Sequence, residues 1–170
     1  MVGWRDVSRY GIKRAAFTII VADQIMPAET IAIASDHAGF QLKSILQEEL
    51  AELGFAALDL GTNDTESVDY PDFAYAMSAA FRDGRTKKGV LVCGSGIGIS
   101  MAANRNPEIR AALIHDSFGA RMARRHNDAN VICFGGRAIG FDVARDCLRT
   151  FLETEFEGGR HARRVDKLSN

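Results

Sequence analysis

The sequence predicts an α/β fold: a single-domain, Rossmann-like three-layer sandwich with a five-stranded parallel sheet. Short apolar runs recur five times along the chain, and stretches with helical apolar spacing separate them. Continuous apolar strands that alternate with amphipathic helices are typical of a parallel sheet covered on both faces. The length of 170 residues, of which 46% are hydrophobic and 25% charged, is that of one globular domain.

The predicted strands share an uninterrupted apolar character and cover 31–35, 56–61, 89–94, 111–115 and 131–136. The predicted helices have apolar residues three or four positions apart and cover about 42–53, 73–81, a short stretch from 97, 117–126 and 143–152. Gly54 and Gly84 end the first two helices, and Pro71 suits a first helical turn. Ser117 is the expected cap of the fourth helix.

Residues 1–29 differ from the rest of the chain, because a basic start precedes the apolar run AAFTIIVA. A signal peptide has a similar outline, but Asp6 lies in the basic part and no small-x-small cleavage site follows. We expect an amino-terminal extension, or an over-long start with Met26 as the natural initiator. The remaining residues, 30–170, form the predicted domain, which closes with a basic tail.

Charge and cysteine content exclude several classes of function. A formal net charge of −1 gives no general attraction for nucleic acid or an anionic membrane, and no apolar run approaches the ~20 residues that span a bilayer. Three cysteines, without a CxxC pair, argue against a disulfide framework. We therefore expect a protein of the reducing cytoplasm whose partner is a small molecule.

Polar side chains follow four of the predicted strands. Because the carboxyl ends of parallel strands meet at one edge of a sheet, ligands bind there, at the point where the strand order reverses. The residues that this edge brings together are Asp36, His37, Cys93, His115, Asp116 and Arg137. Their convergence predicts the position of a site.

The glycine-rich stretch CGSGIGIS at 93–100 predicts a loop that stabilises negative charge. It lacks the Lys and Ser/Thr of a P-loop, and Ile99 stands where a dinucleotide fingerprint needs its third glycine. Glycines nevertheless allow backbone N–H groups to approach a phosphate or an oxyanion closely. Cys93, at the start of the loop, is either a reactive thiolate or a buried strand residue. Cys133 and Cys147 fit a core role.

Each remaining polar residue has a structural interpretation beside a functional one. Asp36 could cap the following helix, and His126 at a helix end is favoured by the helix dipole. The tail could be a solvated charge cluster. Taken together, four basic groups suit a small phosphorylated substrate, and they are Arg137, Arg160, His161 and Arg164.

Six ordered motifs carry a resemblance to a known family: SDHAGF, DYPDFA, LVCGSGIGIS, RRHNDANV, FGGRAIG and EGGRHARRV. In order and spacing they resemble ribose-5-phosphate isomerase of type B and its sugar-phosphate isomerase relatives, over about residues 30–166. The resemblance implies aldose–ketose isomerisation of ribose-5-phosphate to ribulose-5-phosphate, a step of the pentose phosphate pathway. It proceeds through an enediolate, without a metal or another cofactor.

The resemblance also implies roles for single residues. Cys93 is the base that moves the proton, Ser95 helps to shuttle the hydroxyl proton, and His126 or Asp36 opens the sugar ring. The implied substrate-binding residues are Gly94, Gly96, Gly98 and Asn127 at the oxyanion, Tyr70 beside the sugar, and His37, Arg137, Arg160, His161 and Arg164 at the phosphate. The family assembles as homodimers or dimers of dimers that share their sites between subunits.

Three alternatives stay open from the sequence. The substrate could be another sugar phosphate, such as a tetrose, allose or galactose phosphate. A non-catalytic module that binds a sugar phosphate would have no need of a thiolate beside an oxyanion loop. A thiol redox protein would need a resolving cysteine near Cys93, and none is present.

Overall fold

A five-stranded, all-parallel sheet with the strand order β2-β1-β3-β5-β4 forms the centre of the protein. The structure, a computed structural model, describes residues 28–168. The strands are β1 (Thr30–Ser35), β2 (Ala56–Asp59), β3 (Lys88–Cys93), β4 (Ala111–Leu113) and β5 (Val131–Gly135). The predicted α/β class and five-stranded parallel sheet are confirmed.

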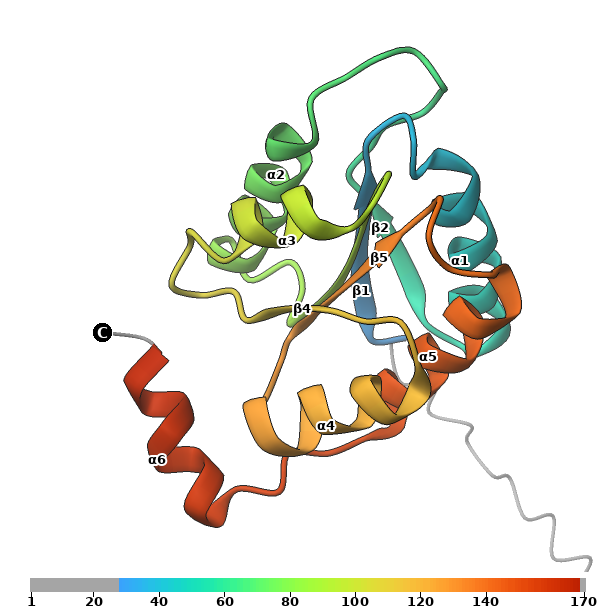
Figure 1. The fold of residues 1–170 in the computed structure, drawn as a ribbon. Coiled ribbons are helices and arrows are strands. Elements are labelled where there is room, and N and C mark those ends of the chain that lie inside the picture. Colours follow the sequence, from blue (N-terminus) through green and yellow to red (C-terminus); the bar gives the residue numbers. More distant parts are fainter. Residues whose placement is uncertain (1–27, 169–170) are drawn as a thin grey trace, which may run out of the picture.

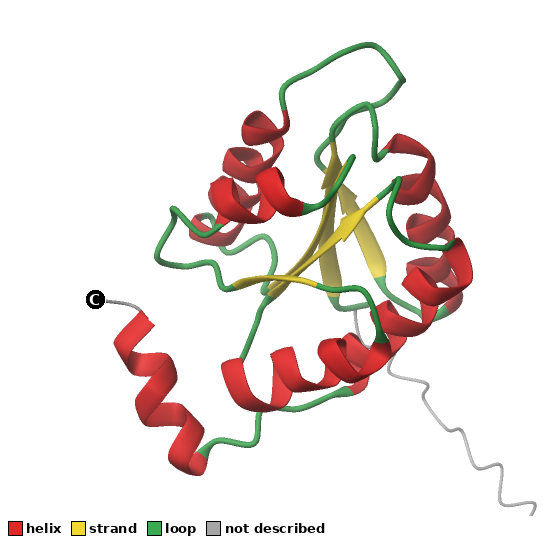
Figure 2. Cartoon of the chain, in the orientation of Figure 1, coloured by secondary structure: helices red, strands yellow, loops and turns green. Residues whose placement is uncertain are grey.

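Helices cover both faces of the sheet, as Figures 1 and 2 show. They are α1 (Phe40–Glu52), α2 (Tyr70–Arg82), α3 (Ile97–Ala103), α4 (Ser117–Asn127), α5 (Phe141–Glu153) and α6 (Ala162–Val165). Apolar residues of α1, α4 and α5 share one core cluster with one face of the sheet, and those of α2 and α3 share another with the opposite face. Within residues 28–168, each helix is too short or too polar to span a lipid bilayer.

The element boundaries differ from the predicted ones by a few residues. The second and fourth strands end earlier than predicted, at Asp59 and Leu113, and the third ends at Cys93, before the glycine loop. Asp116, not Ser117, caps α4, because its carboxylate accepts the N–H of Gly119 at 2.7 Å.

The basic tail forms a 3₁₀ turn (Gly159–His161), then α6, then a second 3₁₀ turn (Asp166–Leu168). Almost all of the predicted extension, with Met26, lies outside the described residues.

The order in which the chain adds strands to the sheet reverses at the central strand β3. The earlier strands β1 and β2 lie on one side of β3, and the later strands β5 and β4 lie on the other. The loops after β1 and β5 lead to α1 and α5 on one face, whereas the loop after β3 leads to α3 on the other. In open parallel sheets such a reversal opens a crevice at the carboxyl ends of the strands. Cys93 stands at the end of this central strand.

A buried ion pair between Lys43 and Asp59 stabilises the sheet at the end of β2. The side chain of Lys43 is only 1% exposed, and its Nζ donates to both carboxylate oxygens of Asp59 at 2.6 and 2.7 Å. Asp59 also accepts the N–H of Gly61, whose carbonyl accepts the N–H of Ser35 at 2.7 Å. The pair therefore links α1 and β2 to the end of β1.

The same contacts set the titration of Asp59. Burial alone would raise its pKa, but hydrogen bonds from Lys43, Gly61 and Gln47 outweigh that effect and lower it below 3.8. A carboxylate whose pKa is lowered in the folded state stabilises the protein at pH values above its ordinary pKa. This stabilisation is lost as the pH falls through the lowered pKa.

Replacing Asp59 by Asn should lower the free energy of unfolding by about 2–3 kcal/mol, because the ammonium of Lys43 then stays buried without a counter-charge. Chemical denaturation at neutral pH measures the loss. Lys43→Met is the matched control, since it removes the charge and keeps a long unbranched side chain. It should cost less than Asp59→Asn, and an equal or larger cost would contradict the role given to the buried charge.

Candidate active site

Cys93 forms the centre of the candidate active site. Its side chain is buried, and the N–H of Gly96 donates to its sulfur at 3.1 Å. The glycine loop therefore folds back over the thiol. Cys93 is buried, as one of the two interpretations predicted, and its reactivity stays a prediction.

Two glycines make this loop geometry possible. Gly96 has φ +77°, and a Cβ there would lie 2.4 Å from Leu113 and 2.8 Å from the carbonyl carbon of Phe134. A Cβ on Gly98 would lie 2.6 Å from the ring of Tyr70. The ring of Tyr70 therefore packs directly on Gly98, in the first turn of α3.

The loops after β1, β3 and β5 are joined by backbone hydrogen bonds. The N–H of Asp36 donates to the carbonyl of Val92 at 3.1 Å, and the N–H of Gly136 donates to that of Cys93 at 2.8 Å. The N–H of Arg137 donates to the carbonyl of Gly94 at 3.1 Å. The two outer loops thus flank the thiol on either side.

Two polar residues follow β1. The carboxylate of Asp36 is buried and accepts the N–H of Gly39 at 3.0 Å, which closes the turn before α1, whereas α1 itself has no side-chain cap. Nδ1 of His37 lies 3.2 Å from both the carbonyl oxygen and the amide nitrogen of Val68. The ring of His37 is therefore anchored to the loop that leads into α2 and Tyr70.

On the other side, the exposed side chain of Arg137 passes beside Gly94. A guanidinium and an imidazole on opposite sides of an amide-lined loop form a setting for a phosphorylated anion. The hydroxyl of Ser95 accepts the N–H of Ile97 at 3.3 Å, so this side chain stays within the loop.

The other predicted residues form a second cluster. The rings of His126, at the end of α4, and His161, in the tail, are stacked with centroids 4.2 Å apart and an interplanar angle of 1°. Nε of Arg160 donates to the ring of His161 at 3.3 Å. A cavity of about 340 Å³ beside this pair is lined by His126, Asn127, His161, Arg164, Val165 and Leu168.

Within one chain the two clusters lie at opposite ends of the sheet. α4 starts where β4 ends and runs back, so that Asp128 contacts Arg110 just before β4, and Asn130 adjoins Gly89 near the start of β3. Cys93 lies at the other end of the strands. The five residues of β5 alone span about 13 Å between the two ends. Figure 1 shows α6 and the adjoining end of α4 at the lower left, away from the loops after β3 and β5.

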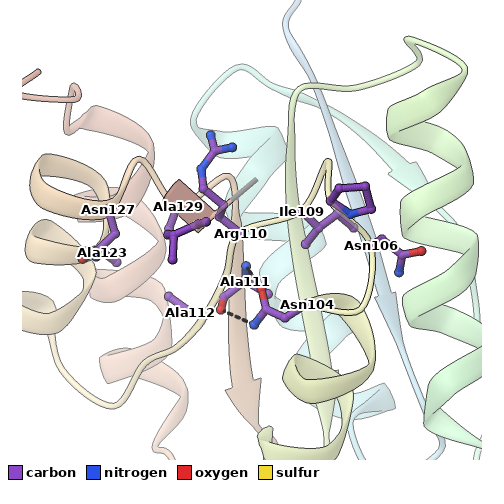
Figure 3. Close-up of a pocket in the computed structure, with 11 residues that line it drawn as sticks. Asn104, Asn106, Ile109, Arg110, Ala111, Ala112, Ala123, Asn127 and Ala129 are labelled. Carbon is purple, nitrogen blue, oxygen red and sulfur yellow. Dashed lines mark hydrogen bonds between the residues drawn. The ribbon is translucent and has the colours of Figure 1, made fainter. Parts of the chain in front are cut away.

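A larger cavity of about 410 Å³ adjoins the second cluster (Figure 3). It lies along the edge strand β4 and is lined by Asn104, Asn106, Pro107, Ile109, Arg110, Ala111, Ala112, Ala123, Asn127, Ala129 and Leu168. Asn127 borders both cavities. In α3, which follows the Cys93 loop, the apolar side chains of Ile97 and Met101 are exposed.

The predicted core roles of the other two cysteines are confirmed. Both side chains are fully buried. Burial, with Cys93 nearby, raises the pKa of Cys133, and burial raises the pKa of Cys147 to about 11. Both thiols therefore stay protonated near neutral pH. Among the three cysteines, only Cys93 has a backbone donor at its sulfur.

The sequence interpretation missed two contributors to the site. Val68, which anchors His37, acts through its backbone, so its side-chain type carries no signal. Asp128, which follows His126 and Asn127, has a left-handed backbone with φ 45° and ψ 40°. Its position directly after a helix, where Asn or Gly often adopts this conformation, was the available signal.

The chain resembles enzymes that act on phosphorylated sugars. The sequence profile of the family described as Ribose/Galactose Isomerase matches residues 31–168. Ribose-5-phosphate isomerase B of Escherichia coli is 40% identical over 139 residues, which cover 82% of this chain and 93% of that protein. D-erythrulose-4-phosphate isomerase of Pectobacterium atrosepticum is 40% identical over 140 residues, which cover 82% and 92%.

A solved structure extends the likeness to three dimensions. Ribose-5-phosphate isomerase B from Mycoplasma genitalium, with bound ribulose-5-phosphate, matches with a TM-score of 0.79 and 39% identity. The match covers 85% of this chain and 96% of that one.

Lowering the pH from about 7.5 to about 5.5 should loosen the tail segment 159–168. Burial, then the nearby His126 and Arg160, lower the pKa of His161 below 6.5, against the smaller opposing effect of Glu157. As the pH falls, His161 therefore takes up a proton at a higher pH in the opened tail than in the closed one. Acid thus favours the opened tail. Hydrogen–deuterium exchange of the segment measures this. In His161→Phe, which keeps a ring but has no proton to gain, the pH dependence should shrink; an unchanged dependence would assign it to another group.

Proposed function

The chain belongs to the ribose/galactose isomerase family, which makes it a sugar phosphate isomerase, and from that premise we propose that it interconverts ribose-5-phosphate and ribulose-5-phosphate. One observation carries the proposal: the buried sulfur of Cys93 lies under the N–H of Gly96, between the loops that hold His37 and Arg137. A base, an anion-stabilising donor and cationic groups are the components that this isomerisation needs.

In the proposed reaction the thiolate of Cys93 removes the proton from C2 of the open-chain aldose. The electron pair moves into a C1–C2 double bond, and the former carbonyl oxygen at C1 becomes the enediolate oxyanion. Backbone N–H groups of residues 94–98 stabilise this charge. The thiol then returns the proton to C1, while the O2 proton passes to O1 with the help of Ser95. C1 is reduced and C2 oxidised within one molecule, so no cofactor is required.

Substrate binding divides between the two clusters. Arg137 and His37 bind one side of the phosphate, and Tyr70 lines the sugar. The second cluster supplies further phosphate donors from Arg160, His161 and Arg164, ring opening by His126 and an oxyanion donor from Asn127. Asp36 is the alternative ring-opening group, but its hydrogen bond to Gly39, in the turn before α1, favours a structural role. Binding of the phosphate, remote from the reacting carbons, can then contribute to catalysis.

A homodimer brings the clusters together in this proposal. The second cluster lies at the opposite end of the sheet from Cys93, so it cannot reach the Cys93 of its own chain without unfolding α4. A two-fold arrangement uses the same two surfaces twice and completes two sites. The cavity beside β4 and the exposed Ile97 and Met101 are surfaces that such a dimer could bury. Dimers of dimers fit the same scheme.

A second substrate class is favoured by one specific observation. The D-erythrulose-4-phosphate isomerase of Pectobacterium atrosepticum is as similar to this chain as the Escherichia coli enzyme is. A four-carbon sugar phosphate would use the same base and phosphate groups, with a shorter distance between them. The three cysteines of the chain are unpaired, which supports a reducing compartment such as the cytoplasm for either reaction.

Cys93→Ala should lower kcat on ribose-5-phosphate by about 10³-fold or more, because the proton transfer loses its base, while the sugar phosphate still binds. Turnover of four-, five- and six-carbon aldose phosphates, with calorimetric titration of the same compounds, measures both effects. Cys147→Ala, a buried cysteine in α5, is the matched control and should keep wild-type turnover. Retained activity in Cys93→Ala would remove the assigned base, and binding without turnover in the wild type would indicate a sensor.

Co-expression of Cys93→Ala and His126→Ala chains should restore turnover that neither variant has alone. A mixed dimer holds one site with both groups intact, so random pairing of equal amounts gives about a quarter of the wild-type sites. Mixing Cys93→Ala with Arg137→Ala is the matched control: both changes fall on the same cluster, and no mixed site is intact. Failure of the first mixture to exceed the second would contradict a site shared between chains.

A further inference from the structure

The residue that directly follows α4 adopts a left-handed backbone conformation, which is uncommon outside glycine. Asp128 has φ 45° and ψ 40°, and among residues 28–168 it is the one non-glycine residue with positive φ. Glycine is the usual choice at this position after a helix, because it has no Cβ to strain. Aspartate and asparagine are the other residues that tolerate this conformation, so the contacts of the Asp128 carboxylate decide what the residue does.

Two arginines hold that carboxylate. Oδ1 of Asp128 accepts from Nη1 of Arg124 at 2.9 Å, and Oδ2 accepts from Nη2 of Arg110 at 2.8 Å. Nε of Arg110 also donates to the backbone carbonyl of Asp128 at 2.8 Å. We call Arg110, Arg124 and Asp128 the carboxylate clamp. Both the side chain and the backbone of Asp128 are thus fixed.

The clamp is anchored to the protein interior. Arg124 is only 7% exposed, and its Nη1 also donates to the carbonyl of Ala129 at 2.6 Å, while its Nε donates to that of Thr154 at 3.2 Å. Its guanidinium lies over the ring of Phe151 in α5, 5.6 Å from the centroid. Arg110 comes from the segment just before β4. The end of α4 is therefore tied to α5 and to the edge strand.

The two residues just before Asp128 belong to the second cluster. Asn127 is exposed and borders both cavities, and His126 stacks on His161. Both side chains leave the backbone at the end of α4, which the clamp holds, so the clamp fixes the position from which each side chain starts.

We propose that Asp128 is a positioning residue, which, through the carboxylate clamp, aims Asn127 and His126 at the substrate in the site completed by the partner subunit. This inference rests on the proposed function, because it needs an isomerase site that is shared between chains. A misplacement of a catalytic group by about 1 Å can cost up to about 10²-fold in rate.

Two variants separate positioning from strain. Asp128→Asn keeps a side chain that tolerates the left-handed conformation but loses the charge that both arginines bind. Asp128→Gly relieves the backbone and loses the carboxylate altogether. Both should lower kcat by roughly 10- to 100-fold with little change in KM, since Asn127 and His126 act on the reacting carbons and the ring. A strain role alone would leave Asp128→Gly fully active.

The matched control is Arg149→Met, which breaks another arginine ion pair, to the buried Glu49 between α1 and α5. It should destabilise the protein without lowering kcat at temperatures where each variant is folded. A similar fall of kcat in Arg149→Met would assign the effect to stability and overturn the proposal.

A second readout does not need activity. The chain has four histidines, so the ring Cε1–H signals of uniformly ¹³C-labelled protein can be assigned by single substitutions. Asp128→Asn should shift the signals of His126 and His161 and leave that of His37 unchanged. Unchanged histidine signals, or shifted signals with unchanged kcat in an active enzyme, would overturn the inference. If the wild-type protein turns over no sugar phosphate, the proposed function is wrong even where the histidine signals shift. The catalytic consequence of the clamp is then rejected with it.

Discussion

The polarity of the parallel sheet is the constraint on which the rest of the structure depends. Every strand runs in the same direction, so each connecting helix must carry the chain back to the opposite edge. The loops after β1, β3 and β5 therefore collect His37, Cys93 and Arg137 at one edge. The same rule sends the end of α4, with His126 and Asn127, to the other edge. Within one chain, the two groups of residues that the proposed reaction needs together therefore lie at opposite ends of the sheet.

Close backbone approach gives the Cys93 cluster its definition. Hydrogen bonds join the three loops directly, and glycines at the contacts leave no room for a side chain. Where the loop folds back over the thiol, only a glycine fits at position 96, because Leu113 and the backbone of β5 already occupy the space that a Cβ would need. The geometry around Cys93 is thus fixed by packing and backbone hydrogen bonds, as electrostatic stabilisation without rearrangement requires in the proposed reaction.

Much of this could be predicted from the sequence. The five apolar runs and the spacing of the helices predicted the parallel sheet, and the strand ends predicted which residues gather at its carboxyl edge. The strand order could not be predicted, because β4 and β5 are both apolar runs in the sequence and the pairing of each strand with its neighbours depends on the whole fold. The role of Asp116 as the cap of α4 was missed, because Ser117 is an equally good capping residue.

The separation of the site into two clusters could be anticipated only through the family resemblance. Spacing along the chain does not tell which end of a helix faces which edge until its strand is placed. The carboxylate clamp escaped notice for a related reason: Arg110 and Arg124 lie 18 and 4 residues from Asp128, and only the fold brings both to its carboxylate.

The central claim is that one substrate molecule is held by the Cys93 cluster of one chain and the His126 cluster of another. A crystal structure with ribitol-5-phosphate, which has no carbonyl group and cannot isomerise, tests it most directly. The account predicts a phosphate between Arg137 of one chain and His161 of the other, with C1 and C2 beside the sulfur of Cys93. A ligand whose contacts all come from one chain, or one bound away from Cys93, would contradict it.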